Sequence, residues 1–156
     1  MIVSWMTTNQ CNLKCSHCYQ DAGEKYSQEL TTAEAKKMID SIAEAGFQIM
    51  IFSGGEPLMR PDIFELVVYA SSKGLRPVFG TNGMLITKET AEKLKGAGAQ
   101  AMGISLDSLD PEKHNKFRGD NQAYQLAVAG MKNCREAGLP FQIHITLMDW
   151  NRDEVC

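Results

Sequence analysis

The chain has 156 residues, of which 44% are hydrophobic, and a formal net charge of −3. A chain of this length buries roughly two thirds of its unfolded surface, enough for one globular unit with a real core. The acidic balance argues against a duplex nucleic-acid partner, which normally meets a basic face. No apolar run approaches the ~20 residues of a membrane span, and the N-terminus lacks the order of a signal peptide. We therefore expect a cytoplasmic protein with no membrane partner.

Strand-like and helix-like segments alternate along the chain. Strands are expected at residues 2–8, 47–52, 77–80, 101–106 and 141–148. Helices are expected at about 31–46, 61–74, 87–98 and 122–137. A capping box, Thr31 to Glu34, marks the first helix, whereas Asp110-Pro111 is expected to open only a short turn. Strand–helix units in series predict an α/β fold with a parallel sheet and helices outside. A closed barrel of eight units needs about 250 residues, so we expect at most a partial TIM-like (βα) barrel.

Three of the five cysteines lie within eight residues, at Cys11, Cys15 and Cys18. In a reducing compartment such a group indicates a metal or catalytic site rather than a disulfide framework. Three thiolates on one loop can hold three irons of a [4Fe–4S] cluster and leave the fourth iron open for chemistry. Zinc is the main alternative, but it prefers four ligands, and His17 would have to complete the shell beside Cys18.

Other polar and glycine-rich segments follow the next predicted strands. Residues 53–57 (Ser-Gly-Gly-Glu-Pro), 81–83 (Thr-Asn-Gly) and 105–107 (Ser-Leu-Asp) each come directly after a strand. Ligands of parallel α/β sheets bind at the carboxyl ends of the strands, so these segments are expected to meet the cysteine loop, residues 11–18, at one mouth.

Each of these side chains has a distinct chemistry to offer. The glycine pair lets a ligand approach the backbone closely, and Glu56 can pair with an ammonium group. Ser105 and Asp107 can bind hydroxyls such as those of a ribose, and Arg118 can hold a carboxylate with two parallel hydrogen bonds. Alone, each has a plainer interpretation: the glycines as a turn, Asp107 as a turn cap and Arg118 as a solvated charge.

The pattern Cys-x3-Cys-x2-Cys, together with Gly-Gly-Glu-Pro and Ser-Leu-Asp at these places, resembles the radical S-adenosylmethionine (SAM) superfamily. The resemblance covers essentially the whole chain and implies an enzyme with a [4Fe–4S] cluster and SAM as cofactors. In that family a reduced cluster splits SAM into methionine and a 5′-deoxyadenosyl radical, which abstracts hydrogen from the substrate. The family core is a partial barrel of six strand–helix units. We expect residues 1–156 to form one domain with about five of them, the sixth unit and any C-terminal domain lying outside this sequence.

The resemblance also assigns residues by position. The cluster ligands would be Cys11, Cys15 and Cys18. The residues expected to contact SAM are His17, Gly54, Gly55, Glu56, Ser105, Asp107 and Arg118. Histidine at position 17 is a mild departure, because the family more often has tyrosine or phenylalanine there, near the adenine.

The amino-acid sequence in and around the motifs is most similar to that of radical SAM enzymes of tetrapyrrole biosynthesis, in the heme d1 and alternative heme routes. SPASM-type peptide or protein maturases and the molybdenum-cofactor cyclase are alternatives, and a non-catalytic Fe–S or zinc-binding module is an alternative of another class. The expected partners are a small-molecule substrate, such as a tetrapyrrole, or a peptide, and a reductant such as flavodoxin or ferredoxin. An open sheet edge predicts self-association as well.

The remaining candidates have plainer expectations. Cys134 lies on the apolar face of a predicted helix and is expected to be a core thiol. Cys156 is interpreted as a free terminal thiol. Asn82 is interpreted first as a turn residue, with a contact to substrate as the alternative. His144 either points into the mouth of the barrel or is a structural histidine.

Overall fold

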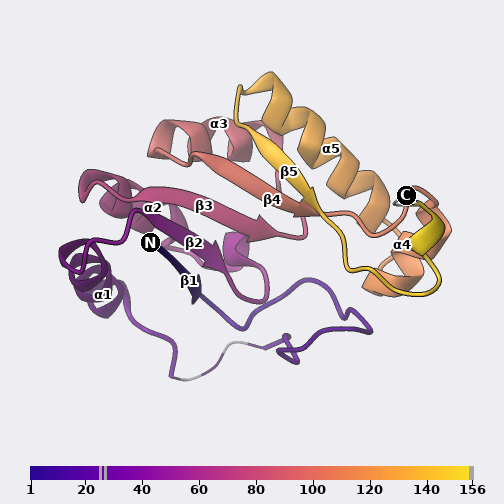
Figure 1. Cartoon of the computed structure of the whole chain (residues 1–156), viewed down its shortest axis with the longest axis horizontal. Helices are drawn as coiled ribbons and strands as arrows, with labels where there is room; N and C mark the ends of the chain where they lie inside the picture. Colours follow the sequence, from indigo (N-terminus) through magenta and orange to yellow (C-terminus); the bar gives the residue numbers. More distant parts are fainter. Residues whose placement is uncertain (25, 27, 155–156) are drawn as a thin grey trace.

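A computed structural model describes residues 1–24, 26 and 28–154 of the chain; Cys156 lies outside the described residues. The sheet has five parallel strands in the order of the sequence (Figure 1). They are β1 (Ile2–Met6), β2 (Ile49–Ser53), β3 (Arg76–Thr81), β4 (Ala101–Ser105) and β5 (Phe141–His144). The predicted α/β partial barrel is confirmed.

The helices pack against one another along one side of this sheet. They are α1 (Thr32–Glu44), α2 (Ile63–Ser72), α3 (Lys88–Ala97), α4 (Pro111–Arg118) and α5 (Ala123–Glu136), with 3-10 turns η1 (Pro57–Met59) and η2 (Arg152–Glu154). Between the helices and the sheet lies the core, where Phe52 and Phe79 stack with ring centroids 5.5 Å apart. Because side chains alternate along a strand, the neighbours of these residues face the other, concave side of the sheet.

On the concave side of the sheet, glycines lie beside larger side chains of the adjoining strands. An added Cβ at Gly80 would lie 3.3 Å from Ser53 Oγ, and one at Gly103 would overlap the ring of His144. The glycines therefore make room for side chains of the adjoining strands on this side.

The predicted capping box at the start of α1 is confirmed. Thr31 Oγ1 accepts a hydrogen bond from the Glu34 N–H at 3.3 Å, and Glu34 Oε2 accepts one from the Thr31 N–H at 2.8 Å. This reciprocal pair satisfies two amide donors that the first turn leaves free.

The expectation of a short turn at Asp110-Pro111 is wrong, because helix α4 begins there. Asp110 Oδ1 accepts from the N–H groups of the second and third helical residues, and Pro111 occupies the first helical position. The helix ends at Gly119, whose φ of 74° is left-handed. Arg118 consequently lies in the last turn of a helix, and its side chain is largely buried rather than solvated.

Strand β5 is shorter than the predicted 141–148, for a reason that bears on the site. After His144 the chain leaves the sheet, and the Thr146 N–H donates to Asp107 Oδ1 at 2.9 Å. The Asp107 side chain, from the connection between β4 and β5, thus accepts the hydrogen bond that a neighbouring strand would otherwise accept from Thr146.

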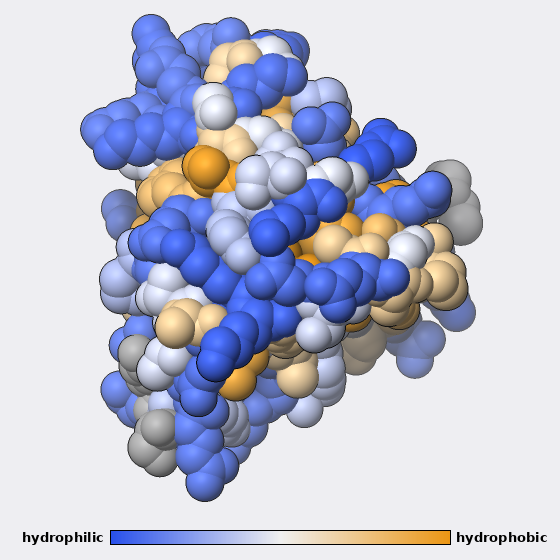
Figure 2. Space-filling view, turned by 90° about the vertical axis from the view of Figure 1, so that its left-hand side faces the viewer, coloured by the Kyte–Doolittle hydropathy of each residue, from blue (hydrophilic) through white to orange (hydrophobic). Residues whose placement is uncertain are grey.

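The end of the molecule where the strands begin has a largely hydrophilic surface (Figure 2). Figure 2 shows that hydrophilic side chains cover most of this face, with apolar side chains in smaller groups between them. Within the described part of the chain, no helix combines the length and the apolarity that crossing a membrane requires.

Candidate cofactor site

A hollow of about 350 Å³ lies at the carboxyl ends of the strands. It brings together residues from the cysteine loop and from the ends of β2, β3, β4 and β5, as the sequence predicted. Its lining includes Cys11, Cys15, His17, Cys18, Gly54, Gly55, Asn82, Ser105, Arg118 and His144. Of the ten residues expected to bind metal or SAM, Glu56 and Asp107 are the two that do not line it.

The three thiols receive hydrogen-bond donors. A backbone N–H points at Sγ of Cys11 and another at Sγ of Cys18, each at 3.4 Å, and Arg118 Nη1 lies 3.9 Å from Cys15 Sγ. Donors of this kind favour the thiolate form and tune the electronics of iron–sulfur sites.

Burial acts in the other direction. It raises the pKa of Cys11 and of Cys15. Neighbouring thiolates raise the pKa further, Cys15 and Cys18 at Cys11 and Cys18 at Cys15, while the Arg118 charge partly offsets the effect at Cys15. Three negative sulfurs in this half-buried loop are unfavourable by themselves, so the loop suits a cationic group that neutralises them.

The distribution of the sulfurs distinguishes two kinds of metal site. Among the residues that the structure describes, no three His, Cys, Asp or Glu side chains converge closely enough to hold one metal ion. A cubane cluster has a different requirement, because each thiolate binds its own iron. The donors therefore suit a cluster better than a single zinc ion, and ligation of iron by these thiols stays a prediction.

The middle of the cysteine loop rests on the end of α4. The Ser16 N–H donates to the Phe117 carbonyl oxygen at 3.1 Å, and the ring of His17 stacks on that of Phe117 with centroids 4.0 Å apart. His17 Nδ1 is buried and has no hydrogen-bond partner within the described part of the chain. The stacking fixes the His17 ring at the wall of the hollow, where its predicted contact with the adenine stays a prediction.

The glycine pair after β2 has a packing role as well as a place in the lining. An added Cβ on either Gly54 or Gly55 would collide with the backbone of residues 7–10, and Gly54 has a φ of 135°. The Gly55 N–H donates to the Thr8 carbonyl oxygen at 2.8 Å. Only glycine allows the end of β2 to approach the end of β1 this closely.

The Glu56 carboxylate is fully buried beneath the hollow. Its oxygens accept from Thr81 Oγ1 at 2.9 Å, from the Asn82 N–H at 2.9 Å and from the Leu58 N–H at 3.1 Å. Burial raises the pKa of Glu56 to about 7, although these hydrogen bonds oppose the shift. The carboxylate thus holds the end of β3, and its predicted contact with the SAM amino group stays a prediction.

Asp107 is also buried, behind Arg118. Its Oδ2 accepts from Arg118 Nε at 2.6 Å, its Oδ1 accepts from Thr146, and its N–H donates to His114 Nδ1 at 3.1 Å. The Nε of Arg118 is therefore occupied, and Nη1 is the end that reaches toward Cys15 and the hollow. Asp107 positions this guanidinium, and its predicted direct contact with SAM also stays a prediction.

Two further residues of the sequence analysis, Cys134 and His144, now have places, and so does a buried histidine, His114. Cys134 is fully buried in the core, and burial raises its pKa to about 11, so the prediction of a core thiol is confirmed. His144 lines the hollow, as one of its two interpretations required. His114, in contrast, is a structural residue: its Nδ1 accepts a hydrogen bond, and burial lowers its pKa.

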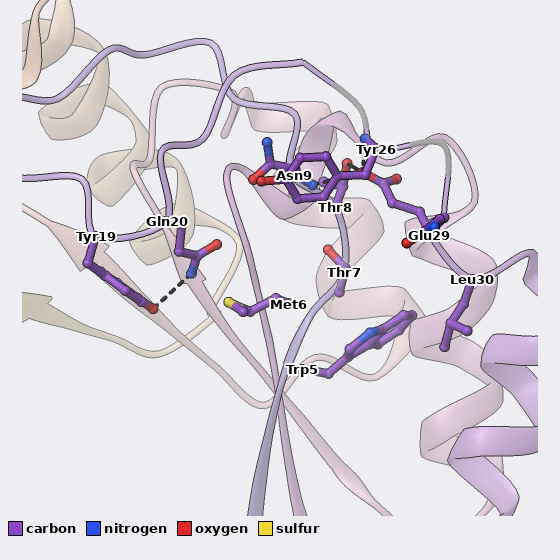
Figure 3. A pocket seen from close by; sticks show the side chains of 11 residues that line it. Trp5, Met6, Thr7, Thr8, Asn9, Tyr19, Gln20, Tyr26, Glu29 and Leu30 are labelled. Carbon is purple, nitrogen blue, oxygen red and sulfur yellow. Dashed lines mark hydrogen bonds between the residues drawn. The ribbon is translucent and has the colours of Figure 1, made fainter.

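A second hollow, of about 580 Å³, lies along β1 and the segment that leads to α1 (Figure 3). Tyr19 and Gln20 line both hollows, and Gln20 Nε2 donates to Tyr19 Oη at 2.8 Å. Glu29, which also lines the second hollow, accepts hydrogen bonds from Thr8 Oγ1 at 2.9 Å and from the Asn9 N–H at 2.8 Å. This carboxylate ties the segment before α1 to the end of β1.

Comparisons with known proteins agree with the geometry. The model of the radical SAM superfamily matches residues 5–156. The chain is 44% identical over 155 residues to an AdoMet-dependent heme synthase of Methanosarcina barkeri, which covers 99% of this chain and 44% of that protein. It is 35% identical over 136 residues to the mycofactocin maturase MftC of Mycolicibacterium smegmatis, covering 87% of this chain and 34% of that protein. The chain spans less than half the length of these relatives.

A solved structure supports the fold. Native anSMEcpe with bound AdoMet superposes with a TM-score of 0.75 at 22% identity, over 91% of this chain and 42% of that one. With the family model matching nearly the whole length, this chain belongs to the radical SAM superfamily, whose members use SAM and an iron–sulfur cluster.

Proposed function

We propose that residues 1–156 form the core domain of a radical SAM enzyme, in which Cys11, Cys15 and Cys18 ligate three irons of a [4Fe–4S] cluster. The observation that carries this proposal is the shared hollow: the cysteine loop faces the same space as the glycine pair after β2 and Arg118. When bound, the cluster supplies the electron that splits SAM, and the resulting 5′-deoxyadenosyl radical abstracts hydrogen from the substrate.

The residues around the hollow each have a proposed task toward SAM. Arg118, whose Nε is held by Asp107, presents the Nη end of its guanidinium, which faces the hollow, to the SAM carboxylate. The backbone at Gly54 and Gly55 receives the amino group, above the buried Glu56 carboxylate. Ser105 binds a ribose hydroxyl, and the adenine lies near His17, whose ring Phe117 holds in place.

For the substrate, we propose a tetrapyrrole, because the heme synthase relative is 44% identical over nearly the whole of this chain. The enzyme would work in the cytoplasm with a flavodoxin or ferredoxin as reductant. The exposed edges of β1 and β5 would pair with the rest of a longer chain or with a second copy.

A second candidate is a peptide maturase, which the similarity to MftC favours. The two candidates differ in substrate and share the cofactor site. To separate the two candidates, the reduced enzyme is incubated with SAM and either a porphyrin carrying propionate side chains or a precursor peptide. The substrate is the compound that loses hydrogen as SAM is cleaved.

The cofactor proposal is tested by anaerobic iron–sulfur reconstitution, followed by EPR of the reduced protein with and without SAM. We expect a [4Fe–4S]⁺ signal that changes when SAM is added. Cys15→Ala should hold less iron and lose the SAM response. Cys134→Ala is the matched control, since this thiol lies in the core, and it should retain both. A full cluster in Cys15→Ala would contradict the proposal.

A further inference from the structure

A hydrogen bond joins the cysteine loop to the end of β3. Asn82 follows β3, and its Nδ2 donates to Oδ1 of Asn12 at 2.8 Å. Asn12 lies directly after Cys11, and 70 residues separate the two asparagines. No turn or helix places them together, so the contact is one of tertiary structure.

Asn82 is itself held from two sides. Its N–H donates to Glu56 Oε2, and its Oδ1 accepts from the Met84 N–H, each at 2.9 Å. The side chain is nearly buried. Because both backbone and side chain are fixed, the amide group of Asn82 is aimed at the cysteine loop with little freedom to turn.

An asparagine in a turn explains only part of this arrangement. The contact from Asn82 Oδ1 to Met84 is the local bond that a turn asparagine makes. It uses the oxygen and leaves the amide nitrogen, which the Asn12 contact engages. The second contact needs a reason outside the turn, and the cysteine loop supplies it.

Two further hydrogen bonds hold the loop at this end: the Glu56 N–H donates to the carbonyl oxygen of Gln10, directly before Cys11, at 2.7 Å, and Asn12 Nδ2 donates to Met84 Sδ at 3.6 Å. Leu13 is buried, but an apolar contact fixes depth rather than orientation. The Ser16 contact holds the loop to α4 on the far side of Cys15. The backbone bond fixes the chain before Cys11, and the Asn12 side chain ties the residue after Cys11 to the segment that follows β3.

We propose that Asn82 is a positioning residue that, through Asn12, sets the place of the cysteine loop against the sheet. The inference rests on the proposed function of the three cysteines as iron ligands. A loop that is already held near its binding geometry loses less conformational entropy when the metal group binds, and it releases that group more slowly. Glu56 takes part indirectly, because its carboxylate fixes the Asn82 backbone.

The test compares wild type, Asn82→Ala, Asn12→Ala and the double variant. Hydrogen exchange of the amides of residues 11–18 is measured in the metal-free protein, and the rate of iron loss to bathophenanthroline in the reconstituted one. Each single variant should speed exchange and iron loss about fivefold, the effect of one buried hydrogen bond. The double variant should be no faster than the faster single variant, because both remove the same bond.

Several controls isolate the tether. Asn12→Ala leaves the contact between Asn82 and Met84 in place, so it tests the tether even if Asn82→Ala disturbs the turn. Asn121→Ala, at an exposed asparagine, should leave both rates unchanged. Exchange in α3 should stay at its wild-type rate in every variant.

The outcomes separate this inference from the proposed function. A wild-type protein that takes up no iron would refute the cysteines as ligands, while the metal-free exchange data would still decide on the tether. Wild-type rates of exchange in Asn12→Ala, or effects that add in the double variant, would overturn the inference whatever the iron content.

Discussion

The segments after β2 and after β4 each bury a carboxylate beneath the same hollow, but they satisfy it differently. Glu56, after β2, accepts from uncharged donors alone among the described residues: a threonine hydroxyl and two backbone N–H groups. Asp107, after β4, faces the Arg118 guanidinium at 2.6 Å. One carboxylate depends on hydrogen bonds alone, whereas the other belongs to a buried ion pair.

The difference matters for what each segment can do. Neutral donors hold Glu56 beneath the lining, where its carboxylate supports the backbone of Asn82 at the wall of the hollow. The ion pair of Asp107 instead fixes a cation that does line the hollow. From this contrast we expect that disrupting Asp107 affects charge at the site, and that disrupting Glu56 affects its shape and its response to pH.

The largest expected effect is that of Asp107→Ala. The substitution leaves Arg118 buried without its partner, and breaking a buried pair in this way costs about 3–5 kcal/mol of unfolding free energy. Urea denaturation measures it. Asp153→Ala, which removes an exposed carboxylate, is the control and should change stability by less than about 0.5 kcal/mol. A loss below about 1 kcal/mol for Asp107→Ala would mean that solvent reaches Arg118.

The next effect is a pH dependence that belongs to Glu56. Its pKa is raised from 4.5 to about 7 in the folded protein, so the folded state holds this proton more tightly than the unfolded chain does. The free energy of unfolding should therefore fall as pH rises from about 4.5 to about 7, by ~3 kcal/mol. Below that window the contribution is fully present.

Denaturation at a series of pH values in wild type and Glu56→Gln isolates this contribution. The difference between the two curves should show the fall, because glutamine does not titrate. Glu89→Gln, at an exposed helix position, should follow the wild-type curve through the same window. Parallel curves for wild type and Glu56→Gln would show that the hydrogen bonds outweigh burial at this carboxylate.

Much of the fold was predictable because its signals are local. Buried parallel strands are continuous apolar runs, and glycine or a capping residue marks most helix ends, as at Thr31 and Gly98. Helix α4 was missed because Asp110-Pro111 also suits a turn. The buried pair His114 and Phe117, three residues apart, was the available signal of a helical face.

The candidate site likewise has a part that the sequence predicts and a part that it does not. The cysteine spacing and the glycine pair identify one edge of the sheet, since the strand before each segment fixes where it emerges. The direction of a side chain is not local information. Glu56 and Asp107 turn beneath the lining because Thr81, 25 residues from Glu56, and Arg118, 11 residues from Asp107, meet them there. The Asn12–Asn82 contact has no sequence pattern at all.

The smallest expected effect compares two buried threonine hydroxyls. Thr81 Oγ1 donates to the Glu56 carboxylate at 2.9 Å, whereas Thr7 Oγ1 donates to the Ser53 carbonyl oxygen at 3.0 Å. Hydrogen bonds to charged groups contribute about 1.5–3 kcal/mol and neutral ones about 1 kcal/mol. At pH 8, where Glu56 is mostly ionised, Thr81→Val should therefore cost about 2 kcal/mol and Thr7→Val about 1 kcal/mol.

The comparison becomes sharper at low pH. At pH 5 the Glu56 carboxyl is mostly protonated, so the bond from Thr81 is one between neutral groups. Thr81 Oγ1 also accepts from the Gly83 N–H at 3.0 Å at either pH, so the gap between the two valine variants in urea should narrow at pH 5 without closing. A difference that stays the same from pH 5 to pH 8 would show that Glu56 keeps one protonation state throughout.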